Sequence, residues 1–152
     1  MGYRHSHDEI VAAAAAVALD DGIGALTYGR VAKRLGTSDR MIVYYLPSKA
    51  DLVQAAVGAL SSSLQQLLVD AFGDRPRPAD ELLRAAWPVF ATPEADRVAA
   101  LFLEIVGLAA AGTEPFAQLA PALLESWVTW LADRVAAPSP ATRRRGALGV
   151  VA

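Results

Sequence analysis

Apolar residues recur along the chain at the three- and four-residue spacing of a helix, and no stretch alternates with the period of two typical of strands. We therefore predict an all-α protein. The first predicted helix runs from about Ser6 to Asp21, where Gly22 and Gly24 end it. One face of this helix carries the apolar residues that we expect to be buried, which are Ile10, Ala14, Val17 and Ala18.

A second helix is predicted from Thr27 to Leu35, with Thr27 as its N-cap. Leu26 precedes the cap and Val31 occupies the fourth helical position, so the two form a hydrophobic staple. Gly36 ends this helix, since glycine readily adopts the left-handed conformation found just beyond a helix.

A third, short helix is predicted from Asp39 to Tyr45, with Ser38 as its N-cap and Pro47 as its stop. A helix of this length is marginal in isolation, so its neighbours must hold it in place. We expect Ile42 and Leu46 to form its buried side. Its exposed side is predicted to consist of Thr37, Asp39, Arg40, Met41 and Tyr44.

A long helix is predicted after Ser48, whose side chain pairs with Asp51 in a capping-box-like arrangement. Its apolar stripe keeps helical spacing as far as Gly73 and is predicted to consist of Leu52, Ala56, Leu60, Ser63 and Leu67.

The clearest linker in the chain is the charged, proline-rich stretch at residues 74–78. Beyond it, helices are predicted at about residues 79–91, 93–111, 114–136 and 141–152. Pro88 and Pro121 fall inside two of these helices, and we expect them to kink or break those helices.

The two short helices between Thr27 and Tyr45 are joined by a tight glycine-containing turn and braced by a longer helix on each side, which is the pattern of a helix-turn-helix. In that motif the second helix enters the major groove of DNA, where its first residues meet the base edges. We therefore expect two domains, a DNA-binding helix-turn-helix domain at residues 1–50 and a helical domain at residues 51–152.

The net charge of −2 argues against a nucleic-acid partner, whereas the distribution of charge favours one. Between Arg30 and Lys49 there are five basic residues and one acidic residue, and from Asp51 onward there are eight arginines and eleven acidic residues. A basic segment on an acidic body is typical of a DNA-binding protein with a separate regulatory domain, although a solvated helix face gives the same count. Arg30, Lys33 and Arg34 are expected to be solvated and to face away from the groove.

Composition argues against several other classes of protein. The chain has no cysteine, its two histidines lie in the N-terminal tail, and it has neither a glycine-rich phosphate loop nor an HExxH pattern. We therefore expect that the protein is not an enzyme and that it binds no cofactor and no metal. No run reaches the ~18 apolar residues of a membrane span, and no basic segment precedes an apolar run as in a secretory signal, so we expect no membrane partner and a cytoplasmic location.

The segment from Leu26 to Leu52 resembles the DNA-binding domain of tetracycline-repressor-like (TetR-family) regulators, and the likeness includes residues Val31–Leu35. The preceding alanine-rich helix with its acidic, glycine-containing end matches as well, and the likeness covers about residues 5–60. The resemblance implies a ligand-responsive transcriptional regulator, most often a repressor, that binds a palindromic operator on double-stranded DNA as a homodimer.

The resemblance also implies roles for individual residues. Thr27 would hold a phosphate at the helix start, and Tyr44 and Lys49 would contact phosphate, which fixes register without specifying sequence. The residues implied to lie at the floor or wall of the groove are Thr37, Ser38, Arg40 and Met41. Arg40 is the best base reader among them, because its guanidinium matches guanine O6 and N7.

Three positions depart from the family pattern. Val43 stands where an aromatic residue is usual and can make no polar contact, so Tyr45, which replaces a frequent histidine, is expected either to supply the lost phosphate contact or to pack in the core. Asp39 stands where a neutral or basic residue is common. It could accept a hydrogen bond from a cytosine amino group, and we favour the alternative that it caps its helix.

The second domain holds most of the aromatic volume. If it resembles the family, it encloses an apolar pocket for a small-molecule effector and dimerises through its last two helices. Candidate ligand contacts are Trp87, Phe90, Phe102, Glu104 and Trp127, although residues of this kind are more often core or interface positions than ligand contacts. Glu104 interrupts an apolar stretch, which suggests either a ligand contact or, as the simpler interpretation, a surface position on an amphipathic helix. Family members usually have a complete final helix after the one near Ala141, and we expect the dimer helix of this chain to be either short or cut off.

One further function stays open at this point. A helical small-molecule-binding or scaffold protein without DNA activity would also explain the acidic total charge and the missing aromatic residue at Val43. The sequence does not identify the effector, the operator or the regulated genes.

Overall fold

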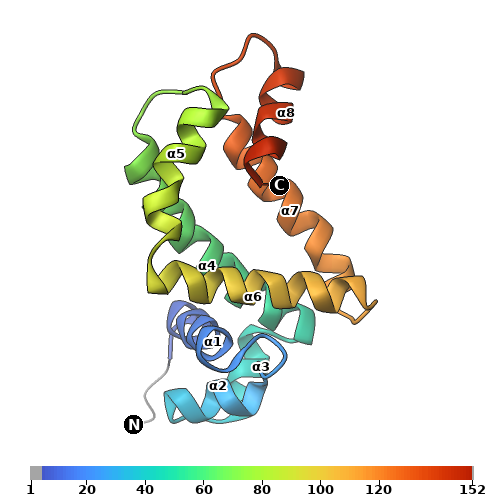
Figure 1. The fold of residues 1–152 in the computed structure, drawn as a ribbon. Helices are drawn as coiled ribbons and strands as arrows, with labels where there is room; N and C mark the ends of the chain where they lie inside the picture. The colour runs from blue at the N-terminus through green and yellow to red at the C-terminus, as the bar shows by residue number, and fades with distance from the viewer. Residues whose placement is uncertain (1–4, 152) are drawn as a thin grey trace. The chain divides into compact units, whose positions relative to one another are not determined.

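A computed structural model describes residues 5–151 of the chain, and helices account for most of them (Figure 1). These residues contain no β-strand, and one isolated bridge joins Arg77 to Val135. The all-α fold class is therefore confirmed. The helices are α1 (His7–Asp21), α2 (Tyr28–Leu35), α3 (Asp39–Tyr45), α4 (Lys49–Phe72), α5 (Ala79–Phe90), α6 (Pro93–Ala110), α7 (Phe116–Ala132) and α8 (Pro140–Val151).

The chain forms two compact units that do not follow the sequence in order. The first comprises the described part of Met1–Ser63 together with Arg97–Leu119, and the second comprises Leu64–Asp96 and Ala120–Ala152 as far as it is described. Most of α6 thus belongs with the N-terminal helices. The functional division at residues 50 and 51 stays a prediction.

In the first unit, α1 packs against α2 and α2 packs against α3, which is the arrangement that a helix-turn-helix needs (Figure 1). Ser6 caps α1 through a full capping box with Glu9. The apolar face predicted for α1 is confirmed, because Ile10, Ala14, Val17 and Ala18 are all buried.

The apolar stripe predicted for α4 is correct at its start and wrong further along. Leu52, Ala56 and Leu60 are buried, whereas Ser63 and Leu67 are exposed. The buried stripe instead continues in steps of four residues through Leu64, Leu68 and Phe72. A step of three and a step of four both keep helical spacing, so the sequence pattern alone does not decide which of the two neighbouring rows is buried.

Among the described residues, α4 is the one helix long and apolar enough to cross a membrane by length and composition. The same criterion is met by core helices of soluble proteins. A charged capping box at its start and a continuous buried stripe along one side are features of such a core helix.

Neither proline predicted to kink or break a helix ends one. Pro88 lies inside α5 and Pro121 lies inside α7, and both helices continue past them. Pro121 is the sixth residue of its helix and Pro88 is close to the end of its own. Each therefore removes only one backbone hydrogen bond near a helix end, where the loss is easiest to tolerate.

In the second unit, α5 packs against α8, and the linker joins the end of α7 through a short backbone bridge. Arg77 N–H donates to the Arg134 carbonyl at 2.9 Å, and Ala136 N–H donates to the Arg77 carbonyl at 2.8 Å. The core of this unit includes Phe72, Leu82 and Val128.

Candidate nucleic-acid interface

The helix-turn-helix begins at Thr27, as predicted. Its hydroxyl oxygen accepts a hydrogen bond from the Arg30 N–H at 3.3 Å, so Thr27 caps α2. Leu26 and Val31, the two residues of the predicted staple, are both fully buried. Thr27 and Gly29 are exposed, and N–H groups in the first turn of a helix have no partner within the helix, so a phosphate could accept hydrogen bonds at the start of α2.

The turn between the two short helices has the tight geometry that the sequence predicts. Gly36 ends α2 with φ 67° and ψ 33°, in the left-handed region that favours glycine. Ser38 then occupies the N-cap position of α3 with extended backbone, but its side chain makes no capping hydrogen bond. The Ser38 hydroxyl is exposed and available to a partner outside the protein.

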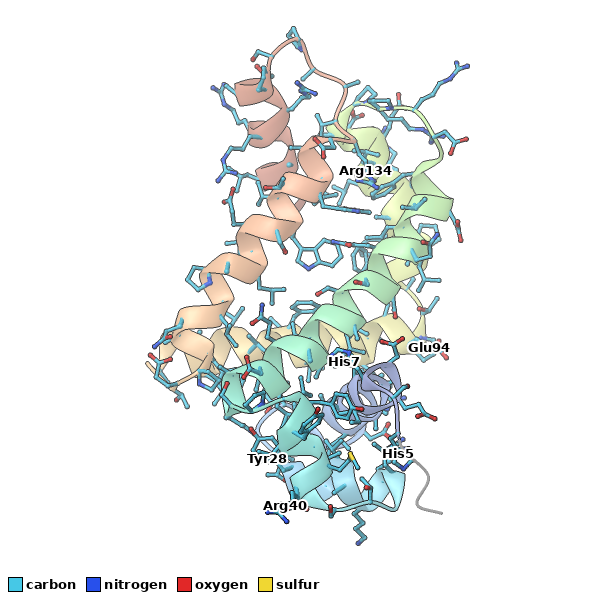
Figure 2. All side chains as sticks on the ribbon, turned by 180° about the vertical axis from the view of Figure 1, so that it is seen from behind. His5, His7, Tyr28, Arg40, Glu94 and Arg134 are labelled. Atoms are coloured by element: carbon cyan, nitrogen blue, oxygen red, sulfur yellow. The ribbon has the colours of Figure 1, made fainter. Side chains whose placement is uncertain are left out.

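The recognition helix α3 has one buried side and one open side. Ile42 and Leu46 are buried, as predicted, while Arg40 is exposed and Tyr44 is 78% exposed. Figure 2 shows the Arg40 side chain extending outward from the helix-turn-helix. Thr37 and Met41 are half-buried, which suits the wall of a contact surface rather than its tip.

A shallow groove of about 490 Å³ follows the open side of α3. Its lining consists of predicted DNA contacts alone, which are Ser38, Arg40, Met41, Tyr44 and Tyr45. The structure thus brings five of the eight predicted contacts to one surface. This surface combines a guanidinium, hydroxyl groups and aromatic rings, the side-chain types that bind base edges and phosphates.

Tyr45 is half-buried and belongs to a chain of aromatic rings at the end of α3. Its ring centroid lies 5.2 Å from that of Tyr44, in an edge-to-face arrangement, and 6.1 Å from that of His7. His7 is the first residue of α1, so the start of α1 adjoins the end of the recognition helix. This proximity is set by the packing of α1, and no spacing in the sequence signals it.

Lys49, a predicted phosphate contact, is half-buried at the start of α4. Its ammonium group donates a hydrogen bond to the Leu26 carbonyl, and burial lowers the pKa of the Lys49 side chain. Lys49 therefore ties the start of α4 to the segment before α2. An ammonium group has two further protons, so the phosphate role stays a prediction.

Ser48 and Asp51 form the predicted capping pair. The Asp51 carboxylate accepts hydrogen bonds from the Ser48 N–H at 2.9 Å and from the Ser48 hydroxyl at 2.6 Å. The Ser48 hydroxyl oxygen in turn accepts from the Asp51 N–H at 3.0 Å. These bonds, led by that from the Ser48 side chain, lower the pKa of Asp51 and keep it ionised.

The basic residues of α2 face away from the groove but are not simply solvated. Arg30 forms an ion pair with Asp21 at 2.7 Å, and Arg34 forms one with Asp20 at 2.9 Å. Only Lys33 among the three is exposed with no ion pair to a described residue. The acidic residues that partner the arginines lie at the end of α1, outside the segment over which the sequence showed an excess of positive charge.

The two remaining departures from the family pattern lie beside the groove. Val43 is 39% exposed and adds an apolar edge to α3. Asp39 is exposed in the first turn of α3, where a carboxylate is favoured by the helix dipole. Its oxygens lie close to Gly29 near the start of α2, the position of a Cβ added there being 3.6 Å from Oδ2.

None of the five predicted ligand contacts lines the groove along α3. On α5, Trp87 is 72% exposed and Phe90 is 40% exposed, while Phe102 on α6 is half-buried. Trp127 is half-buried on α7, with its ring centroid 5.6 Å from that of Trp130. Their roles toward a ligand stay predictions.

In the second unit, Trp130 contacts Phe72 and Arg134, two partners that were not predicted from the sequence. The Trp130 ring lies 6.0 Å from that of Phe72, and the guanidinium carbon of Arg134 lies 3.7 Å from its ring centroid. Burial lowers the pKa of Arg134, which also donates to the Trp130 carbonyl at 2.7 Å. The spacing of four residues within the helix predicted at residues 114–136 was the available signal for this cation–π pair. In the structure α7 ends at Ala132, so Arg134 lies in the turn just beyond the helix.

Glu104, the fifth predicted ligand contact, lies in the first unit against the turn between α1 and α2. Its carboxylate oxygens accept hydrogen bonds from the Ile23 N–H at 3.0 Å and from the Gly24 N–H at 2.9 Å.

Among residues 5–151, no group of three or more His, Asp or Glu side chains is placed to hold a metal ion.

Comparisons with known proteins agree with this geometry. The family model described as "Bacterial regulatory proteins, tetR family" matches residues 10–56, which contain α2, α3 and the start of α4. No curated protein sequence matches the chain.

Three solved structures share its fold. The proposed transcriptional regulator SCO7518 from Streptomyces coelicolor A3(2) is 20% identical, with a TM-score of 0.69. The match covers 95% of the present chain and 82% of SCO7518, and the coverages below are given in the same order. A transcriptional regulator from Rhodococcus sp. Rha1 is 24% identical, with a TM-score of 0.68 and coverage of 97% and 79%. The multidrug binding protein EbrR, solved with imidazole, is 22% identical, with a TM-score of 0.70 and coverage of 99% and 80%.

The family match falls on the helices that carry the open surface of α3, and family members are regulators rather than enzymes. The helices at residues 10–56 therefore form a DNA-binding domain of the kind described for bacterial regulatory proteins of the tetR family.

Proposed function

We propose that this protein is a cytoplasmic repressor that binds a palindromic operator as a homodimer and releases it when a small molecule binds the helical domain. The observation that carries the proposal is the open side of α3, where exposed Arg40 and Tyr44 line one groove while the opposite side of the helix is buried. That arrangement suits a helix lying in the major groove of DNA.

The start of α2 and the open side of α3 support the same docking. Thr27 and the N–H groups that follow it suit a phosphate on one side of the groove, and Tyr44 suits a phosphate on the other. Ser38 and Arg40, in between, are then directed at base edges. Phosphate contacts fix the register of α3, so that Arg40 can meet a guanine.

A dimer is proposed because a single short helix reads too few base pairs for a specific site. Two copies would present two α3 helices about one turn of B-DNA apart, roughly 34–36 Å or slightly more. The operator would then be palindromic. Sedimentation velocity on the purified protein, alone and with DNA, tests this step, and a monomer on DNA at saturating concentration would contradict it.

A small-molecule effector is proposed from the second unit and from the solved relative. EbrR is a multidrug binding protein solved with imidazole. In the present chain, half-buried Trp127 belongs to an aromatic cluster with Trp130, and aromatic rings are favourable contacts for apolar or planar ligands. A ligand that prefers a state with a different spacing of the two α3 helices would lower operator affinity.

The DNA-binding part is tested by fluorescence-anisotropy titration against the promoter of the protein's own gene at several salt concentrations. We expect affinity to fall steeply as salt rises, because binding releases counterions from phosphates. Arg40→Ala and Tyr44→Ala are expected to weaken binding. Binding that is absent, or insensitive to salt and to both substitutions, favours the alternative of a helical small-molecule-binding or scaffold protein.

The switch is tested separately. Candidate compounds are chosen according to the proteins that the neighbouring genes encode. Each compound is added to the preformed protein–operator complex, and release of the operator is measured. If the protein binds these compounds but holds the operator equally well with and without them, release by a ligand is contradicted while DNA binding stands.

A further inference from the structure

The turn between α1 and α2 is held by a side chain that lies some eighty residues away in the chain. Both oxygens of the Glu104 carboxylate are used, one by the Ile23 N–H at 3.0 Å and the other by the Gly24 N–H at 2.9 Å. Hydrogen bonds from backbone N–H groups to a carboxylate are stronger than those between neutral groups. We call this arrangement the Glu104 clamp.

A second contact joins the same two parts of the first unit. Arg97 precedes Glu104 by two helical turns, so the two side chains lie on one side of α6. The Arg97 guanidinium donates to the Asp20 carboxylate at the end of α1. Figure 1 shows α6 crossing next to α1, which is seen nearly end-on. The end of α1 and the turn after it are thus held at two points of one helix.

Two glycines leave room for the carboxylate. Gly22 has φ 89°, which favours glycine, and a Cβ added there would lie 3.0 Å from the Glu104 Oε2. A Cβ added at Gly24 would lie 3.2 Å from Oε1. A close approach of this kind at both positions, on either side of buried Ile23, indicates a fitted contact rather than a chance encounter of surface groups.

The turn held by the clamp leads directly into the DNA-binding helices. Leu26 is buried two residues after Gly24, and Thr27 then caps α2 and opens the surface proposed to hold phosphate. Displacement of the turn would move the start of α2, and α3 with it, because α2 packs against α3.

We propose that Glu104 is a positioning residue for DNA binding, which holds the start of the helix-turn-helix to α6 through the Ile23 and Gly24 N–H groups without touching DNA. The proposal rests on the proposed operator binding. It gives the carboxylate a role distinct from that of a ligand contact.

The test compares Glu104→Gln with Glu94→Gln in the full chain. Glu94 is an exposed glutamate at the start of the same helix, so the control removes an identical charge from α6 (Figure 2). Glutamine keeps the size of the side chain but has only one acceptor oxygen, so at least one of the two N–H groups loses its partner. The probe is a DNA duplex selected by the wild-type protein from a random-sequence pool.

Two readouts are expected to change together in Glu104→Gln and to stay unchanged in Glu94→Gln. Amide hydrogen exchange at Ile23 and Gly24 becomes faster, and affinity for the selected duplex falls by about tenfold. The slope of log affinity against log salt is expected to stay that of the wild type, because no phosphate contact is removed. A mere loss of stability would not raise exchange at these two amides selectively in a protein that is still folded.

Gly24→Ala provides a second, independent perturbation that leaves the carboxylate in place. Its added Cβ presses on Oε1, so we expect the same direction of change. In the Glu104→Gln, Gly24→Ala double variant, the loss of affinity should be smaller than the product of the single losses, because both act on one contact. The Gly24→Ala single variant also keeps the proposal testable if changes at position 104 impair folding.

The outcomes separate this proposal from the proposed function. Unchanged exchange at Ile23 and Gly24, or wild-type DNA affinity in a folded Glu104→Gln variant, overturns the clamp while operator binding stands. A changed salt slope overturns it as well, because Glu104 would then act on phosphate binding directly. If the wild-type protein selects no duplex, the proposed function fails and the positioning role for DNA fails with it, whereas faster exchange in Glu104→Gln would show the contact itself.

Discussion

The two helices of the helix-turn-helix differ in what their basic residues contact. Helix α2 carries three basic residues, and two of them are paired with the acidic residues at the end of α1. Helix α3 carries a single one, Arg40, which is exposed and lines the groove. The number of basic residues in a segment therefore does not give the positive charge available to DNA. That charge depends on which of these residues already form ion pairs within the protein.

The largest effect that sharpens this comparison is expected from Arg40→Ala. Because its guanidinium is open and suited to guanine, its loss should weaken specific binding on the order of 10- to 100-fold. Lys33→Ala is the matched control, since it removes an exposed cation from α2 instead. Competition titrations with specific and random DNA measure both. Equal losses in the two variants would contradict the distinction between the helices.

A smaller effect is expected from Tyr44→Phe. The ring would stay in place beside Tyr45, while the hydroxyl proposed to bind phosphate is lost, so affinity should fall by roughly three- to tenfold. The reduction should be similar for specific and random DNA, because phosphate contacts do not read sequence. A loss confined to the specific duplex would instead place Tyr44 against a base.

Arg34→Gln is expected to leave DNA affinity within about twofold of the wild type. Its partner is Asp20, so the change removes an exposed ion pair rather than a DNA contact. The midpoint of thermal unfolding should drop by no more than about 4 °C. Anisotropy and calorimetry on one preparation check both values, and a tenfold loss of affinity would mean that α2 does contribute charge to the interface.

The smallest effect concerns acid. Hydrogen bonds from Arg97 and then Arg34 lower the pKa of Asp20 below its ordinary value. A carboxyl group with a lowered pKa in the folded state stabilises the protein at neutral pH, and this contribution is lost as the pH falls below about 4. The thermal midpoint of the wild type should therefore decrease on acidification more than that of Asp20→Asn. Parallel decreases in the two proteins would contradict the pairing.

The sequence predicted the first half of the chain closely because its signals are local. Thr27, Gly36 and Pro47 act on their own neighbours in the chain, so capping and turn chemistry place the short helices almost to the residue. The open side of α3 followed from helical spacing, with Ile42 and Leu46 on the buried side.

The errors arise where contacts are distant in sequence. The ion pairs of Arg30 and Arg34 depend on how α1 packs against α2, and the hydrogen bonds of Glu104 join α6 to a turn near the N-terminus. Periodicity carries no information on such contacts. Periodicity also did not show which of two neighbouring rows of side chains on α4 is buried, since Leu64 is buried and Leu67 is exposed.

The measurement that tests the central claim most directly is methylation protection of guanine N7 in the selected duplex. If the open side of α3 lies in the major groove, the wild-type protein protects guanines at symmetric positions in two half-sites, and Arg40→Ala at saturating concentration leaves those guanines reactive. Protection that is unchanged in Arg40→Ala, or absent from a duplex that the wild-type protein binds specifically, would contradict the placement of α3 against the bases.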